Sequence, residues 1–294
     1  MVTIEFKKKV IDALAIAREN FNGSDARFAT AIGMNPAIYS RLKKGETEQV
    51  LSDAKFISLA RQLNVSLSNR PEWKIANTPV FQFITTQLKV CQEQGLSSLL
   101  VDLSDIGKSF SADYYCRNNK NAVYIDCSQV KSKQKMIRSI AQGFGVGSTG
   151  RYADVYSDLV YYLRTLPTPL IVLDEAGDLE HSAMLEIKAL WNATEHFCGF
   201  YMMGADGLEN RIRNSINYKK VGYTELFSRF GKRYGKVVPV AGEESNKLLN
   251  ATAMMIIKAN APEGSNHQLI LRNTMGEDGR PSLRRIYNEL TKNQ

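Results

Sequence analysis

The sequence is poor in cysteine and has no long hydrophobic run, and both absences exclude classes of protein. Its four cysteines lie far apart, without a Cys-x-x-Cys pair, which argues against a zinc site and against a disulfide framework. No stretch approaches the roughly 18 apolar residues of a membrane-spanning helix. Residues 1–20 lack the apolar core and cleavage site of a signal peptide and are expected to form an amphipathic helix. These absences predict a cytoplasmic protein with reduced thiols and no membrane partner.

The overall composition is that of a globular protein with an excess of positive charge. Apolar residues make up 44% and charged residues 23% of the 294 positions, which argues against a mainly disordered, collagen-like or coiled-coil chain. At roughly 100–200 residues per domain, this length predicts two domains, or three. Lys and Arg number 38 against 30 Asp and Glu, so the net charge is 38 − 30 = +8. A basic surface attracts phosphates, so the charge favours a polyanionic partner.

Residues 1–70 are expected to form an all-α domain. Their apolar residues recur at spacings of three and four, which is typical of short helices that bury one face. The segment 68–73 is polar and contains a proline, and such a segment predicts a joint between domains.

Short apolar runs alternate with helical patterns from about residue 95 onward. The four runs are residues 99–101, 122–125, 170–173 and 200–203. Continuous apolarity suits strands buried on both faces of a parallel sheet, so the sequence predicts a three-layer α/β domain. From residue 242 onward only helical patterns occur, which predicts a small helical subdomain. The predicted domains are residues 1–70, 71–241 and 242–294.

Residues 24–45 have the pattern of two short helices joined by a tight turn. Ala29 is small where the helices would cross, Gly33 suits a turn with positive φ, and Pro36 suits the first turn of a helix. The stretch resembles the helix-turn-helix domains of the lambda repressor and Cro family, and residues 53–65 resemble the helix that follows in that family. This resemblance implies that residues 1–70 bind DNA.

The second helix of this pair would present a polar and basic face to a major groove. Tyr39 and Ser40 are expected to approach base edges, and Lys43 and Lys44 to hold phosphates. Residues 1–70 hold 11 basic and 7 acidic residues, so their net charge is 11 − 7 = +4, which favours this interpretation. A helical bundle used for protein contacts is the alternative.

A phosphate-binding loop is predicted at Gly107, Lys108 and Ser109, which follow an apolar strand and precede a helix. Lys108 would reach the β- and γ-phosphate oxygens, and the Ser109 hydroxyl would bind Mg²⁺. Backbone groups would cradle the phosphates along Ser104, Asp105, Ile106, Gly107, Lys108, Ser109 and Phe110. The pattern departs from the usual motif at two positions. Asp102 replaces the first glycine, where its carboxylate would face phosphate, and Asp105 replaces a common loop glycine.

A second motif supports the nucleotide site. The apolar run at residues 170–173 ends in Asp174 and Glu175. Asp174 would hold the hydration shell of the metal, and Glu175 would orient and polarise the attacking water. Both motifs in this order predict a nucleoside triphosphate site, while Asp102 and Asp105 predict that hydrolysis is weak.

Residues 75–294 resemble an AAA+ ATPase. Asp206 follows a strand that resembles the one carrying the sensor-1 residue. Arg229 lies in a segment that resembles the arginine-finger segment, and Arg284 lies in one that resembles the sensor-2 motif of the helical lid. The resemblance implies ATP and Mg²⁺ as ligands, and a ring or filament, because an arginine finger acts on ATP bound by a neighbouring subunit. The expected catalytic residues are Lys108, Asp174, Glu175, Asp206, Arg229 and Arg284.

The combination of a helix-turn-helix domain with a compact AAA+ module resembles the B protein of bacteriophage Mu and the related TnsC group of transposition ATPases. This resemblance implies an ATP-dependent filament on double-stranded DNA that selects the target and activates a transposase. Basic residues near the second strand are the candidates for contacting that DNA: Lys131, Lys133, Lys135 and Arg151. The plainer interpretation of these residues is a solvated helix start.

Three other functions fit the same motifs. The chain could be a transcriptional regulator with an ATP-switched oligomerisation domain, or an ATPase of the replication-initiation or helicase-loading kind. In the third alternative, Asp102 blocks turnover and ATP only stabilises a non-enzymatic scaffold.

Overall fold

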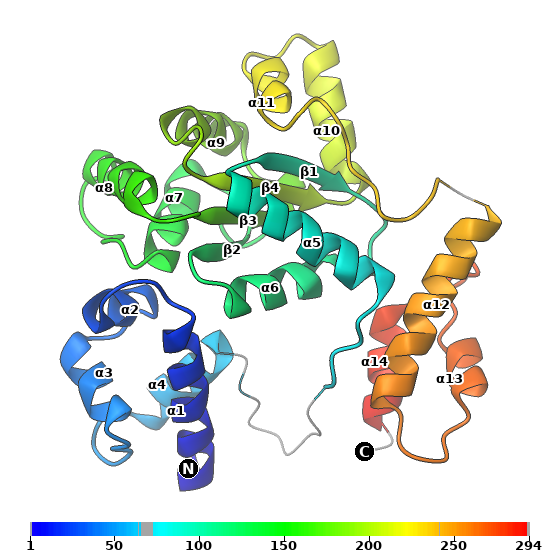
Figure 1. Ribbon diagram of the computed structural model, residues 1–294, viewed down its shortest axis with the longest axis horizontal. Helices are drawn as coiled ribbons and strands as arrows, with labels where there is room; N and C mark the ends of the chain where they lie inside the picture. Colours follow the sequence, from blue (N-terminus) through cyan, green and yellow to red (C-terminus); the bar gives the residue numbers. More distant parts are fainter. Residues whose placement is uncertain (1, 64, 66–72, 241, 293–294) are drawn as a thin grey trace.

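The computed structural model describes residues 2–63, 65, 73–240 and 242–292. Figure 1 shows an N-terminal helical unit, a central parallel sheet covered by helices, and a C-terminal helical unit. The expected domain boundaries at residues 70 and 241 lie outside the described residues. Within the described ranges, no helix combines the length and apolarity that crossing a bilayer requires.

Four capped helices form the N-terminal unit: α1 (Ile4–Glu19), α2 (Asp25–Ala31), α3 (Pro36–Lys43) and α4 (Asp53–Gln62). Each begins after a residue whose side chain accepts a backbone N–H of the first turn, namely Thr3, Ser24, Asn35 and Ser52. Between α2 and α3 the chain turns through Gly33 at φ 68°, a left-handed conformation that favours glycine. The helices enclose a core of their own, which includes Phe6, Leu14, Phe28, Leu42 and Phe56.

The central sheet has the strand order β1-β4-β3-β2, and every neighbouring pair is parallel. Its strands are β1 (Ser97–Val101), β2 (Ala122–Asp126), β3 (Leu170–Asp174) and β4 (Gly199–Gly204). Every residue of β3 and β4 is buried, as the apolar runs predict. Beside β1 the chain adds one further parallel bridge. There the N–H of Val101 donates to the Gly235 carbonyl at 3.0 Å, and the Gly235 N–H donates to Leu99 at 2.8 Å.

Helices cover both faces of the sheet, which confirms the predicted three-layer α/β fold. One face packs on α5 (Pro79–Gln94) and α6 (Lys108–Asn118). The other face packs on α7 (Lys133–Gly143), α8 (Tyr152–Thr165), α9 (His181–Ala193), α10 (Asp206–Asn217) and α11 (Tyr223–Arg229), and a short 3₁₀ turn, η1 (Ala176–Asp178), follows β3.

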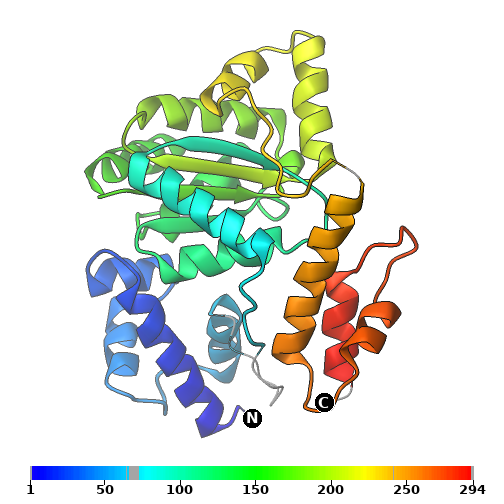
Figure 2. The ribbon, with the colours of Figure 1, turned by 45° about the vertical axis from the view of Figure 1, so that its right-hand side comes forward.

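The C-terminal unit consists of α12 (Glu243–Asn260), α13 (His267–Asn273) and α14 (Leu283–Lys292), which stand beside the sheet in both ribbon views (Figures 1 and 2). Ala253, Ile257 and Ile286 are buried in its core, and Trp73 packs against them. The segment before α5 is tied to this unit as well. The Asn260 side chain accepts the Lys74 N–H at 2.7 Å and donates to the Lys74 carbonyl at 3.0 Å.

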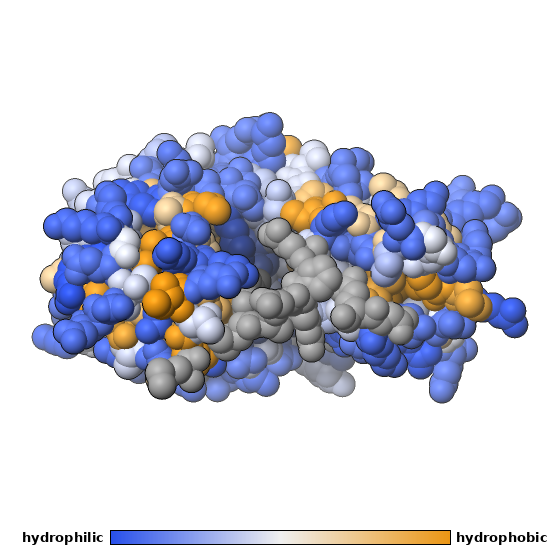
Figure 3. All heavy atoms as spheres, turned by 90° about the horizontal axis from the view of Figure 1, so that it is seen from below, coloured by the Kyte–Doolittle hydropathy of each residue, from blue (hydrophilic) through white to orange (hydrophobic). Residues whose placement is uncertain are grey.

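The N-terminal unit packs on the α/β domain through α2 and the turn before it. The guanidinium of Arg27 lies 4.2 Å from the ring centre of Tyr162, whose hydroxyl donates to the Asn22 carbonyl at 3.3 Å. A Cβ at Gly145 would lie 2.5 Å from the Arg27 carbonyl oxygen, so a glycine is required there. A cavity of about 620 Å³ opens beside this contact, between α1 and α6. The face of the molecule in Figure 3 is mostly hydrophilic, with small hydrophobic patches.

Candidate nucleotide site

The phosphate loop joins β1 to α6, at the carboxyl end of an inner strand of the extended sheet. Gly107 precedes α6 with φ 95°, and Asp105 adopts φ 59°. No side chain caps this helix start in the described chain. A helix N-terminus of this kind offers free N–H groups and a partial positive charge to an anion. The loop therefore leads into an uncapped helix start that suits an anion, although two glycines of the usual motif are replaced.

Lys108 lies inside the loop, 94% buried, and its ammonium group is held by main-chain oxygens. It donates to the Asp102 carbonyl at 2.9 Å and to the Leu103 carbonyl at 2.5 Å. Burial lowers the pKa of Lys108, and nearby carboxylates oppose that shift: those of Asp102, Asp174, Glu175 and Asp206. Within the described part of the chain, Lys108 is the cation that lies among these four carboxylates. The site therefore carries excess negative charge, which a divalent cation would offset.

The Asp102 carboxylate turns away from the phosphate loop, which corrects the expectation that it faces phosphate. One carboxylate oxygen accepts the N–H of Leu103 at 2.7 Å. The other accepts the N–H groups of Val237 and Val238, the latter at 2.9 Å. Asp102 is 4% exposed and fastens the segment after Gly235 to the end of β1. Its carboxylate therefore stabilises the sheet edge and does not block a nucleotide.

Asp174 and Glu175 lie at the carboxyl end of β3. Asp174 is 2% exposed, and its two oxygens accept the Tyr124 hydroxyl at 2.6 Å and the Glu175 N–H at 2.8 Å. Glu175 has φ 48°, which turns the chain sharply and leaves its side chain exposed at the mouth of the site. Burial, and then the neighbouring Asp174, raise the pKa of Glu175, whereas Lys108 lowers it.

Asp206 begins α10, directly after β4, which lies between β1 and β3. The structure thus brings three predicted acids, from the ends of the adjacent strands β3 and β4, close to Lys108 in the loop after β1. No group of three potential metal ligands with metal-binding geometry exists among the described residues. The acids present fit Mg²⁺, which typically takes one or two carboxylates and completes its shell with water and substrate phosphates. Asp174 and the exposed hydroxyl of Ser109 are the residues that would hold it.

A cavity of about 550 Å³ extends from the phosphate loop to the C-terminal unit. Its wall consists of residues 104–111, Glu175, the segment with Trp73, Thr78 and Phe81, and Ile256, Leu283, Arg284 and Tyr287 of the C-terminal unit. The rings of Trp73 and Tyr287 lie 5.0 Å apart in this wall. Volume and lining match the usual small-molecule site, which is mostly apolar with a few placed polar groups. Sequence reasoning missed these two aromatic residues because no phosphate-site motif includes them.

The phosphate loop contacts the C-terminal unit directly through Asp105. The Ser282 hydroxyl donates to the Asp105 carboxylate at 2.7 Å, and the Arg284 N–H lies 3.3 and 3.4 Å from its two oxygens. The Arg284 guanidinium, 85% exposed, lies 3.8 Å from the same carboxylate. Asp105 therefore stabilises the start of α14, and Arg284 is at the cavity, as the sensor-2 resemblance implies.

Arg229 does not line this cavity. It ends α11, where its guanidinium donates to the Asn192 side chain at 3.1 Å and lies 5.4 Å from the Trp191 ring centre. Of the six expected catalytic residues, the structure brings five together and leaves Arg229 apart. An arginine that acts on ATP bound by a neighbouring subunit is expected to lie away from the nucleotide site of its own chain.

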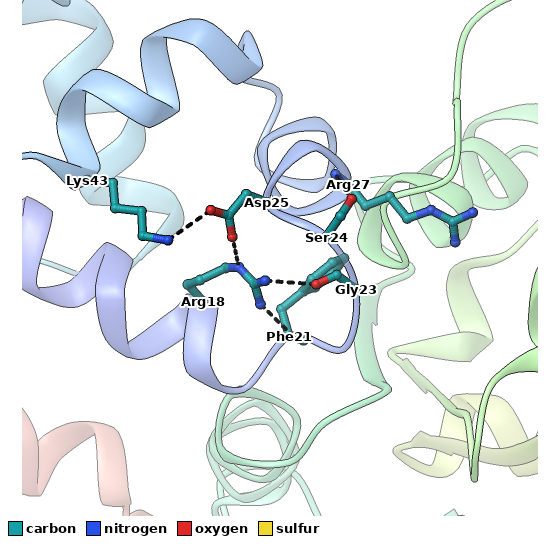
Figure 4. A network of polar contacts seen from close by, with 7 residues as sticks. All are labelled: Arg18, Phe21, Gly23, Ser24, Asp25, Arg27 and Lys43. Carbon is teal, nitrogen blue, oxygen red and sulfur yellow. Dashed lines mark hydrogen bonds and ion pairs between the residues drawn. The ribbon is translucent and has the colours of Figure 1, made fainter.

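The N-terminal candidates for DNA contact differ in exposure. Tyr39 is 3% exposed and packs edge-on against Phe28, so the expectation that it approaches base edges is corrected. Lys43 donates to Asp25 at 2.9 Å, and Asp25 also accepts from Arg18 (Figure 4). Ser40 and Lys44 are exposed.

The candidates for DNA contact on the α/β domain also fall into two groups, those paired with a carboxylate and those that are exposed. Lys131 pairs with Asp178 at 3.1 Å, and Lys133 lies 3.9 Å from Glu186. Lys135 and Arg151 are exposed. Half of the four predicted cations are therefore already opposed by a carboxylate.

Residues 92–212 match the model of a protein family described as an AAA domain. The matched range includes β1, the phosphate loop, Asp174 and Glu175, and it ends before Arg229 and the C-terminal unit. A solved structure of the Aeropyrum pernix Orc1 protein in complex with DNA is similar at a TM-score of 0.46 and 16% identity, over 74% of this chain. This chain covers 65% of that protein's length. No curated protein matches the sequence. The central domain thus combines a three-layer α/β fold with a match to the AAA domain model over residues 92–212.

Proposed function

We propose that this protein binds and hydrolyses ATP with Mg²⁺, assembles with further copies of itself, and does so on double-stranded DNA. The observation that carries the nucleotide part is the convergence of Lys108, Asp174 and Glu175 at one end of the sheet, beside a cavity of about 550 Å³. The AAA domain match over residues 92–212 supports it.

The residues of the site divide the work of phosphoryl transfer. Lys108 exchanges the carbonyls of Asp102 and Leu103 for phosphate oxygens and so neutralises charge in the transition state. The metal, held through Asp174 and Ser109, would polarise the phosphates. Glu175 orients the attacking water and accepts its proton, for which its raised pKa brings it nearer to neutral pH. Arg284 reaches phosphate from the C-terminal unit, and Arg229 from a second copy.

The DNA and transposition parts rest on organisation and resemblance. The N-terminal unit has capped helices joined by a turn at Gly33, and Ser40 and Lys44 are exposed on it. Linked to an AAA domain, this arrangement resembles that of target-selecting transposition ATPases, so we propose a transposase as the client. A regulator or a helicase loader would use the same nucleotide chemistry.

Nucleotide binding can be measured with Trp73, which lines the cavity. The chain has two tryptophans, so Trp191→Phe leaves Trp73 as the sole reporter. We expect ATP to change its fluorescence, Lys108→Ala to abolish the change, and Glu175→Gln to keep binding while turnover falls at least a hundredfold. An unchanged signal with ATP at millimolar concentration contradicts nucleotide binding. Wild-type binding without turnover would instead favour the scaffold.

Assembly can be observed by electron microscopy of the protein on random-sequence duplex DNA with ATP, ADP or no nucleotide. We expect ATP-dependent helical filaments. A discrete footprint on one operator sequence would favour the transcriptional regulator. If the protein does not stimulate a cognate transposase, the helicase loader is favoured.

A further inference from the structure

The positive charge of the chain is concentrated in one short segment. Residues 210–240 contain eight Lys and Arg and one acidic residue, Glu225, so their net charge is 8 − 1 = +7. The whole chain carries +8, so the other 263 residues (294 − 31) are close to neutral, with 30 basic and 29 acidic residues. The segment comprises most of α10, all of α11 and the connection that leads past Gly235. Apart from Arg229, which the proposed function assigns to the ATP of a second copy, neither the nucleotide site nor the N-terminal unit accounts for this charge.

This segment projects from the molecule. In both ribbon views α10 and α11 stand at one end, beside the β1 edge of the sheet and away from the N-terminal unit (Figures 1 and 2). The turn between the two helices holds Tyr218, which is 85% exposed, and Val221, which is 77% exposed. Lys219 and Lys220 lie between them and are exposed. Lys232, Arg233 and Lys236 are exposed on the connection that follows α11.

Few carboxylates oppose these cations. Arg213 and Lys236 share Glu209, and Arg211 donates to the Gly177 carbonyl at 2.7 Å, which neutralises no charge. Lys220 lies over the Tyr223 ring at 5.8 Å, and within the described ranges Lys219, Lys232 and Arg233 form no salt bridge. This differs from Lys131 and Lys133, each of which faces a carboxylate.

Residues next to this segment also show an excess of positive charge. A Cβ at Gly222 would lie 3.5 Å from the Lys188 ammonium, so α9 adds a ninth cation beside the turn. His181 stacks on Tyr223, and its Nδ1 is buried without a hydrogen-bond partner in the structure described here. Burial, and then the charges of Lys220 and Arg211, lower the pKa of His181.

We propose that the α10–α11 surface, the cations of residues 210–240 other than Arg229, is a binding surface for the phosphate backbone of double-stranded DNA, separate from the N-terminal unit. Cations spread over a turn and an extended connection suit a phosphate backbone, which presents charge along a line. A membrane surface fits less well, because the apolar residues of α10 and α11 pack against the core of the α/β domain. The exposed large apolar residues of this surface, within the described chain, are Tyr218, Val221 and Val240. The proposal rests on the DNA part of the proposed function and names the surface that performs it.

The test compares two double variants with equal changes of net charge. K219E/K220E reverses the turn, and K120E/K258E reverses two exposed lysines of α6–β2 and α12, outside the surface. Binding of a random-sequence duplex is measured by fluorescence anisotropy over a range of NaCl concentrations with ATP bound. We expect K219E/K220E to weaken binding at least tenfold and to reduce the salt slope by about 2, since each phosphate contact contributes about 0.9. K120E/K258E should bind like the wild type. Trp73 fluorescence with ATP serves as the folding control.

Each outcome decides the proposal. Wild type that binds no duplex with any nucleotide refutes both this surface and the DNA part of the proposed function. Wild type that binds, with K219E/K220E showing the same affinity and slope, refutes the surface alone. Loss of ATP-dependent self-assembly without DNA in K219E/K220E assigns the surface to contacts between copies. Loss of binding to phosphatidylserine vesicles, with DNA binding intact, assigns it to anionic lipid. Either result overturns the proposal.

Discussion

The Asp105 carboxylate accepts a hydrogen bond from the Ser282 hydroxyl at 2.7 Å, across 177 residues of sequence. The first residue is part of the phosphate loop, and the second precedes the last helix of the C-terminal unit. A glycine at position 105 would also suit the φ of 59° but would form no such bond. The departure from the usual loop thus provides a direct connection between the nucleotide site and the unit that covers it.

Removing this connection should loosen the C-terminal unit. A hydrogen bond to a charged group contributes about 1.5–3 kcal/mol, so Asp105→Gly is expected to raise the rate of nucleotide release about tenfold. Backbone amides at the start of α14 should exchange with deuterium faster, as hydrogen-exchange mass spectrometry can show. Ser282→Ala is the matched variant, since it removes the same bond from the other side. Unchanged exchange in both variants would contradict the connection.

Turnover should depend on the protonation of Glu175. The carboxylate is active when ionised, and its pKa is raised above the ordinary 4.5 by burial and by Asp174. Activity is therefore complete above the raised pKa and is lost as the pH falls through it, at a higher pH than an ordinary glutamate would give. Steady-state ATPase rates from pH 4.5 to 8 measure this acid limb. The Glu175→Asp variant should show the same loss of activity at low pH, with a lower maximal rate. The Glu175→Gln variant should show no such pH dependence.

Tyr39 should contribute to stability and not to base recognition. Tyr39→Ala removes a buried ring that packs on Phe28, and truncations of this size cost about 3–5 kcal/mol. Tyr39→Phe keeps the ring and should leave both the melting temperature and DNA affinity close to those of the wild type. Thermal denaturation followed by circular dichroism makes the comparison. A Phe variant that folds normally but loses DNA binding would restore a role for the hydroxyl at the interface.

Arg229 should act on ATP bound by another copy. Arg229→Ala is expected to bind ATP normally and to lose turnover, because its side chain lies outside the cavity of its own chain. Lys108→Ala is expected to lose ATP binding while keeping Arg229. Mixing the two inactive variants should therefore restore about a quarter of the wild-type rate under conditions of assembly. No recovery in the mixture would remove Arg229 from the site.

The fold was predictable from local patterns, and the site was predictable only in part. The four apolar runs identify the strands because a strand buried on both faces has no polar positions to obscure it. The direction of the Asp102 side chain depends on Val237 and Val238, more than 130 residues away, so no motif at the phosphate loop reveals it. Tyr39 was assigned to the outer face by its polarity, although its spacing of three from the buried Leu42 indicates the core.

The charge of residues 210–240 shows another limit of sequence reasoning. The eight basic residues can be counted from the sequence, but they form no compact motif, and nothing in their spacing indicates that a helix pair carries them together. The predicted basic loop at Lys131 and Lys133 is compact in sequence, yet neighbouring strands and helices supply the acids that pair with it.

The paired hydrogen bonds between Asn260 and Lys74 make the segment before α5 part of the C-terminal unit in mechanical terms. Trp73 adds its ring to the same body, against Tyr287. A movement of the C-terminal unit relative to the sheet would therefore carry Trp73 and Lys74 with it. The residues that lead into α5 would then move with the C-terminal unit, on the side of the cavity that Trp73 lines.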